Sequence, residues 1–188
     1  MLLLLLTALL ALRFAQRWPD LARAMALPAL LLAVIAGLDL PDIDQPLPLD
    51  HRSALTHSIL PALLALLRRW AWPVAGGLAL GLGLHLAADV FPNAMTGFAM
   101  VKVPFAGSIG SDAFYLWLAS NALLCTALGG WLLARQIEGP LLRLLALLLI
   151  VLVGAAYLLG VDGGWPALAV YVAAGWFALR WRRPIQSS

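Results

Sequence analysis

The sequence predicts an all-α, polytopic helical membrane protein with six or seven transmembrane helices, built as a single membrane domain over residues 1–188. Of the 188 residues, 63% are hydrophobic and 11% are charged, and the mean hydropathy is +0.95. Soluble domains are about half apolar and about a quarter charged, so the composition excludes an ordinary cytosolic protein. One crossing takes about 20 apolar residues, which leaves room for six or seven crossings.

Seven apolar segments are the predicted spans. They are Met1–Leu12, Ala24–Leu40, Asp50–Leu67, Trp72–Phe91, Ala113–Ala134, Leu141–Leu159 and Trp165–Leu179. The first reaches only about 18 Å as a helix, so it crosses if Arg13 and Arg17 extend their charged ends to the interface. If it crosses, the N-terminus lies outside the cell membrane. If it lies in the interface instead, the N-terminus lies on the cytoplasmic side. The segment lacks a basic n-region and a small-residue cleavage site, so we do not expect a cleaved signal peptide.

The basic residues are segregated between the two ends of these spans. Ten of the twelve fall on one face: Arg13, Arg17, Arg23, Arg68, Arg69, Arg135, Arg143, Arg180, Arg182 and Arg183. The other face holds Arg52, Lys102 and most of the aspartates. Basic loops stay in the cytoplasm, which predicts an inner (plasma) membrane protein with a cytoplasmic C-terminus. Because the basic residues form small scattered groups, nucleic acid is not an expected partner.

Polar chemistry is concentrated in one part of the chain. His51, His57 and His85 fall within 35 residues of one another, and five of the nine acidic residues lie between Asp39 and Asp89. An ionised side chain at the membrane centre costs about 2.5 to 3.5 kcal/mol, so such a cluster indicates a functional site. His85 and Asp89 are spaced i, i+4 on one helical face and can bind a common ion. The alternative for this pair is a buried hydrogen-bonded contact that stabilises packing.

A proline-rich segment precedes the histidines. Pro41, Pro46 and Pro48 prevent a regular helix through Asp42 and Asp44, which predicts a turn that folds these carboxylates inward. Three imidazoles and two or three carboxylates without a thiolate suit Zn²⁺, with Mn²⁺ or Fe²⁺ as alternatives. They exceed what one tetrahedral zinc uses, so one or two ions are expected. Asp50 is predicted as a further ligand or as the N-cap of the third span.

Several motifs occur in order within residues 37–106. They are Pro41-Asp42-Ile43-Asp44, His51-Arg52, Thr56-His57-Ser58, His85-x-x-x-Asp89 and Val101-Lys102-Val103-Pro104-Phe105. Together they resemble the YdjM/YbcI-like inner-membrane proteins, a family described as metal-dependent hydrolases and distantly similar to zinc-dependent phospholipase C. Residues 112–181 then form a helical scaffold.

The resemblance implies a set of ligands and catalytic groups. It implies metal ligation by Asp42, Asp44, His51, His57, His85 and Asp89, with Asp42, Asp44, Asp89 and Arg52 as the catalytic residues. One departure is clear, because family members carry a Thr-His pair in the first helix and Met1 to Trp18 contains no histidine. Either fewer metals bind here, Asp39 substitutes, or the site is degenerate.

The first functional hypothesis is a membrane-embedded metal-dependent hydrolase, a phosphoesterase acting on a lipid or lipid-linked substrate from the periplasmic side. Arg52 is the predicted phosphate clamp, because guanidinium binds phosphate in a bidentate manner, and Lys102, the only lysine, is a predicted substrate contact. The alternatives are an ion- or proton-coupled transporter and a catalytically inactive metal-binding membrane protein. Transporters carry polar or broken segments through both membrane halves, whereas the polar residues here gather at one end of the spans.

Overall fold

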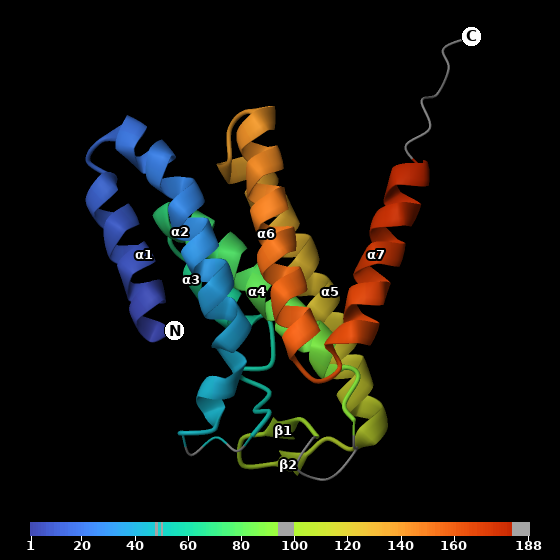
Figure 1. Cartoon of the computed structure of the whole chain (residues 1–188). Helices are drawn as coiled ribbons and strands as arrows, with labels where there is room; N and C mark the ends of the chain where they lie inside the picture. Colours follow the sequence, from blue (N-terminus) through green and yellow to red (C-terminus); the bar gives the residue numbers. More distant parts are fainter. Residues whose placement is uncertain (48, 50, 94–99, 182–188) are drawn as a thin grey trace.

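The computed structural model describes residues 1–47, 49, 51–93 and 100–181, and the regular secondary structure of this part of the chain is almost all helix (Figure 1). The elements in chain order are α1 (Leu2–Ala15), α2 (Pro19–Asp39), the 3-10 helix η1 (Pro41–Asp44), α3 (Leu60–Leu66), the 3-10 helix η2 (Arg69–Ala71), α4 (Trp72–Asp89), β1 (Lys102–Val103), β2 (Gly107–Ser108), α5 (Ser111–Gln136), α6 (Pro140–Gly160) and α7 (Gly164–Trp181). The all-α prediction is confirmed.

Several helices begin where the sequence places a proline. Proline occupies the first turn of α2, η1, α3, α4 and α6. The first-turn N–H groups of a helix have no partner within it, and the fixed φ of proline already matches the helix. The short connections therefore contain residues that favour the start of a new helix. This is why one apolar helix follows another after a sharp turn.

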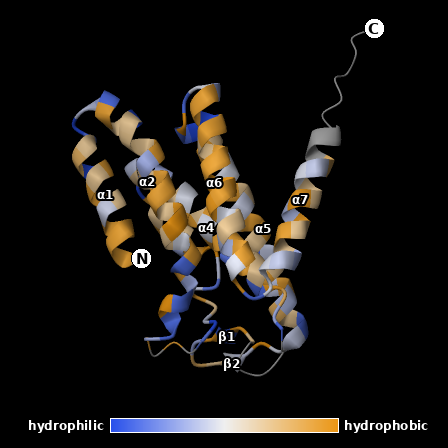
Figure 2. Ribbon diagram, viewed as in Figure 1, coloured by the Kyte–Doolittle hydropathy of each residue, from blue (hydrophilic) through white to orange (hydrophobic). Residues whose placement is uncertain are grey.

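Four helical segments are long and apolar enough to cross a membrane: Pro19–Asp39, Arg69–Asp89, Ser111–Gln136 and Pro140–Gly160. The protein is therefore membrane-associated, while the predicted total of six or seven crossings is not confirmed. Helix α1 has 14 residues, about 21 Å in length. Figure 2 shows hydrophobic residues along the long helices and hydrophilic residues at the α1–α2 turn, at the α5–α6 turn and around η1.

The predicted span Asp50–Leu67 is wrong. Over the described residues 51–67 the only α-helix is α3, seven residues long, which reaches about 10 Å and cannot cross the bilayer. Residues 51–59, here called the site loop, form turns and bends. The Thr56 hydroxyl lies 3.2 Å from the Ser53 carbonyl oxygen, and Ser58 Oγ donates to the Leu55 carbonyl at 3.1 Å. Such local bonds compete with a regular helix, and hydropathy alone does not register them.

Helices α2 and α4 pack backbone against backbone through glycines. A Cβ atom added to Gly77 would collide with the Leu30 carbonyl, and one added to Gly81 would collide with the Val34 carbonyl. Small residues allow this close approach between membrane helices. In an apolar 18-residue window of the Arg69–Asp89 segment 78% of the residues are buried, against 22% in the corresponding window of α6. Helix α4 is therefore the centre of the bundle, and its C-terminal end is fixed relative to the end of α2.

The strands β1 and β2 form a hairpin at the η1 end of the molecule (Figure 1). The N–H of Lys102 donates to the Arg52 carbonyl at 3.0 Å, and the N–H of Ala54 donates to the Lys102 carbonyl at 2.8 Å. The hairpin is thus bonded to the site loop through the backbone. These hydrogen bonds provide partners for backbone N–H and C=O groups of the loop. In a helix, the same groups would be paired within the helix.

Candidate metal centre

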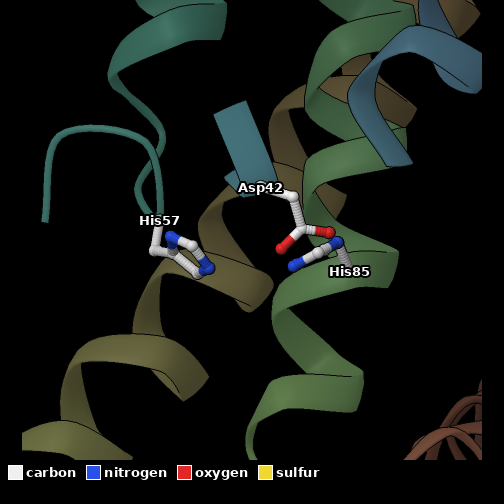
Figure 3. A group of neighbouring side chains, drawn as sticks. All are labelled: Asp42, His57 and His85. Atoms are coloured by element: carbon white, nitrogen blue, oxygen red, sulfur yellow. The ribbon is translucent and has the colours of Figure 1, made fainter. Parts of the chain in front are cut away.

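Three elements bring side chains together at the η1 end of the molecule. Asp42 comes from η1, His57 from the site loop and His85 from the last turns of α4 (Figure 3). Each offers one ligand atom, and these atoms lie within 4.8 Å of one another. The three side chains are therefore close enough to bind one metal ion. Imidazole and carboxylate ligands suit several first-row metals, so the geometry leaves the identity of the metal open.

The carboxylate of Asp89 lies beside both imidazoles. Its Oδ2 atom is 3.3 Å from His57 Nε2 and 3.4 Å from His85 Nε2. Among the described residues, neither Asp89 Oδ2 nor His57 Nε2 has a hydrogen-bond partner, although both atoms are buried. Ligand atoms around a tetrahedral zinc with bonds of about 2.0 to 2.1 Å are separated by about 3.3 Å. The unsatisfied atoms are thus spaced as the ligands of one ion would be.

His85 is held in an orientation that suits a metal ligand. Its Nδ1 atom lies 2.7 Å from the Leu38 carbonyl oxygen and 2.8 Å from the Tyr157 hydroxyl. A carbonyl can only accept, so the short contact with Leu38 places the ring proton on Nδ1. The lone pair is then on Nε2, which faces Asp89. Metal-ligating histidines are commonly fixed in this way by a backbone carbonyl.

His57 is oriented by a buried carboxylate in the same manner. Its Nδ1 atom lies 3.2 Å from Asp44 Oδ2. That oxygen also accepts the Ser53 N–H at 2.8 Å and the Thr56 hydroxyl at 3.0 Å. A proton on Nδ1, shared with Asp44, leaves the Nε2 lone pair directed at Asp89. Asp44 therefore has the position of an orienting residue for His57.

The charge state of Asp44 follows from these contacts. Burial on its own favours the neutral carboxyl, but His57 and the donors from Ser53 and Thr56 outweigh it and hold the pKa of Asp44 below its usual value. Hydrogen bonds to the ionised form stabilise it in this way. The second oxygen, Asp44 Oδ1, is buried and accepts no hydrogen bond from the described residues. His51 Nδ1 lies 3.9 Å from it, so these two side chains adjoin the cluster.

Arg52 neutralises Asp89 from the side away from the histidines. Its Nη2 atom lies 2.8 Å from Asp89 Oδ1, and its guanidinium lies over the Phe114 ring at 5.6 Å. Arg52 has a φ of 60°, a left-handed conformation that is uncommon outside glycine. Conformations of this kind cost about 1 to 3 kcal/mol and gather at functional sites. The backbone of the site loop is therefore strained at the residue that pairs with Asp89.

Helix α5 supports the site loop at two points. Trp117 Nε1 donates to the His57 carbonyl at 2.8 Å, and Asn121 Oδ1 accepts the Ile59 N–H at 2.9 Å. Neither residue was a candidate site residue, and Tyr157 was missed as well. Two of the three had a weak signal in the sequence, since Asn121 interrupts an apolar segment and Tyr157 carries the only hydroxyl of α6. The scaffold helices thus contribute directly to the site.

The remaining predicted site residues lie at the edge of the cluster. Lys102 contacts the site loop through its backbone. Asp39 is exposed at the end of α2 and is not among the three residues placed around a common point. Asp50 lies outside the described residues. No match was found when the chain was compared with protein-family models, with curated proteins and with solved structures. The resemblance to the YdjM/YbcI-like proteins accordingly stays a prediction carried by the motifs.

Proposed function

We propose that the protein is a membrane-embedded, divalent-metal-dependent hydrolase. The observation that carries the proposal is the convergence of His57 Nε2 and His85 Nε2 on Asp89 Oδ2, with two of these buried atoms lacking a hydrogen-bond partner among the described residues. Asp42 offers a ligand atom within 4.8 Å of ligand atoms of the same two histidines. A bound Zn²⁺, or Mn²⁺ or Fe²⁺ in its place, supplies a hydroxide at neutral pH and polarises a phosphoryl oxygen.

The chain's own residues provide the rest of the chemistry. Asp44 fixes the tautomer of His57, and Arg52 brings a guanidinium to the edge of the cluster. Guanidinium pairs with phosphate oxygens in a bidentate manner, so an anionic phosphoester is the substrate class that this site suits. A carboxylate of Asp42 or Asp89 that is not fully used in ligation accepts the proton of the attacking water.

The position of the site supports an amphiphilic substrate. The cluster lies at the ends of α2 and α4, two helices that are apolar and long enough to cross a membrane. A phospholipid or an isoprenoid phosphate presents its phosphoester at that level. In the arrangement we propose, the metal end faces the periplasm and the arginine-rich end faces the cytoplasm, as the positive-inside rule requires.

Transport is the rival function. A transport pathway requires polar groups through the bundle, whereas the buried interior of α4 is formed by Val74, Leu78 and Leu82. This apolar interior favours a site that is closed toward the arginine-rich end. A protein that binds metal without turnover is the other alternative, because the first-helix histidine expected from the resemblance is missing.

The test is metal content followed by turnover. We expect detergent-purified protein to hold about one or two equivalents of metal by elemental mass spectrometry, and His57→Ala and His85→Ala to lose it. Asp89→Asn should abolish phosphate release from lipid phosphoesters. Asp20→Asn is the matched control, because Asp20 is exposed at the opposite end of the molecule.

Each outcome separates the alternatives. Protein that stays metal-free after reconstitution with zinc and manganese contradicts the proposal. Metal without hydrolysis of any lipid phosphoester indicates the inactive metal-binding protein, and metal-dependent ion flux in liposomes indicates transport.

A further inference from the structure

Two adjoining cavities lie at the end of the molecule opposite the metal centre. They have volumes of 230 and 420 Å³ and share Arg23, Gln136 and Glu138 as lining residues. Their walls come from the α1–α2 turn, η2 and the α5–α6 turn, and Figure 1 shows the α1–α2 and α5–α6 turns at the top, far from η1 and the hairpin. We call the two cavities together the arginine pocket.

The smaller cavity concentrates positive charge from three separate elements. Arg23 comes from α2, Arg69 from η2 and Arg135 from α5. Within the described part of the chain, Arg69 and Arg135 form no salt bridge, and Arg23 has only an exposed contact of 3.7 Å with Asp20. Glu138 is the single acidic residue among the described residues that line this cavity. The cavity therefore carries a net positive charge and suits an anion.

The larger cavity combines polar and apolar lining residues. Arg23 and Glu138 line it together with Leu27 and Leu142. Arg23 and Leu27 are four residues apart on α2, so Leu27 lies about 6 Å further along the helix than Arg23. A free phosphate or a soluble nucleotide gains nothing from apolar lining residues. An amphiphile with a charged head gains from both kinds of lining residue.

A backbone carbonyl in the wall of the larger cavity indicates which kind of headgroup the cavity suits. Pro28 lies inside α2 and has no N–H, so the carbonyl of Ala24 loses its helical donor. Both residues line the larger cavity. A carbonyl that lacks its usual helical donor, in a cavity that Glu138 also lines, favours a ligand that brings hydroxyl donors next to its phosphate.

We infer that the arginine pocket binds an anionic glycerophospholipid of the phosphatidylglycerol type. The three arginines contact the phosphodiester, the Ala24 carbonyl and Glu138 accept hydrogen bonds from the glycerol hydroxyls, and the first acyl carbons pack on Leu27 and Leu142. Basic pockets between membrane helices bind anionic headgroups in this way. The inference does not depend on the proposed hydrolase, because the pocket and the metal centre lie at opposite ends of the bundle.

Native mass spectrometry of the full chain in detergent, titrated with phosphatidylglycerol, tests the inference. We expect one saturable lipid adduct and a preference over phosphatidylcholine. Arg69→Gln with Arg135→Gln should weaken this binding by roughly tenfold or more, since each arginine near an anionic lipid contributes about 1 kcal/mol. Arg17 and Arg68 lie at the same end of the molecule but are not among the described residues that line the two cavities. Arg17→Gln with Arg68→Gln removes the same charge and should change phosphatidylglycerol binding less than twofold.

A second variant tests the shape of the larger cavity and leaves every charged residue in place. Ala24→Trp should fill the larger cavity and reduce phosphatidylglycerol binding while leaving metal content and melting temperature unchanged. Soluble glycerophosphate should not compete at concentrations that saturate the lipid site. Equal losses in the two arginine pairs, or full binding by Ala24→Trp, would overturn the inference and leave only unspecific attraction between a basic surface and an anionic lipid. Competition by glycerophosphate would overturn it in favour of a free-phosphate site.

Discussion

At the scale of single residues, His85 shows how a scaffold helix takes part in the site. Its Nδ1 atom contacts Leu38 on α2 and Tyr157 on α6, so three helices fix one imidazole ring. Loss of a hydrogen-bond partner of a metal-ligating histidine typically weakens metal binding by 10- to 100-fold. The ring then keeps one partner on Nδ1 and gains rotational freedom.

We therefore expect Tyr157→Phe to weaken zinc binding by about tenfold, measured by competition with a chromophoric chelator. Tyr171→Phe is the matched control, because the Tyr171 hydroxyl contacts Thr126 and the Gly83 carbonyl rather than the His–Asp cluster. Equal zinc affinities in the two variants would show that Tyr157 only packs against the ring.

Arg52 and Asp89 form a second coupled unit at this scale. Both side chains are largely buried, with 12% and 15% exposure. Removing one partner of a buried ion pair leaves an uncompensated charge and costs about 3 to 5 kcal/mol. A metal ion at the cluster would supply the missing positive charge.

Arg52→Gln should therefore lower the melting temperature of the metal-free protein, and excess Zn²⁺ should restore part of the loss. The measurement is thermal unfolding in detergent with chelator and with zinc. A loss of the same size under both conditions would contradict a metal at Asp89.

At the scale of elements, the contact of α2 with α4 sets the distance between the carboxylates that follow α2 and the histidine on α4. Gly81 lies directly against the α2 backbone. A methyl group there forces the helices apart, and overpacking of this kind costs about 1 to 3 kcal/mol.

We expect Gly81→Ala to lower both the melting temperature and the zinc affinity. Gly130→Ala provides the comparison, because a Cβ at Gly130 meets nothing within 4 Å and alanine favours a helix over glycine by about 1 kcal/mol. If Gly81→Ala melts no lower than Gly130→Ala, the direct backbone contact is not required.

The elements also show what the sequence can and cannot predict. Hydropathy predicts the long helices, and the motifs predict Asp42, His57 and His85, whose side chains meet at the cluster. The site loop was predicted as part of a span because hydropathy does not register hydrogen bonds. Its fold depends on the hydrogen bonds that Ser53 and Thr56 donate to Asp44. Trp117 and Tyr157 were missed because their partners lie 60 and 72 residues away, and only the packed bundle brings them together.

At the scale of the whole molecule, the metal centre and the arginine pocket occupy opposite ends of one bundle. The distribution of basic residues predicts that the metal end faces away from the cytoplasm. Ser108 is exposed at the metal end and Arg17 at the other, while Cys125 is fully buried.

In a Cys125→Ser background, Ser108→Cys should react with a membrane-impermeant maleimide in intact spheroplasts, and Arg17→Cys should react only after lysis. The reverse pattern would invert the proposed orientation and place the metal centre in the cytoplasm. Labelling of both positions before lysis would show that the spheroplasts leak.

Helix α3 has a consequence for the lipid around it. Leu63, Leu64 and Leu67 are exposed on this helix and just beyond it, yet the helix is only about 10 Å long beside a hydrocarbon core of about 30 Å. A bilayer that meets a short apolar wall becomes thinner there. Thinning next to the site loop draws headgroups inward, toward His57 and Asp89. Under the proposed function, a lipid would then present its phosphoester to the cluster while its chains stay in the leaflet.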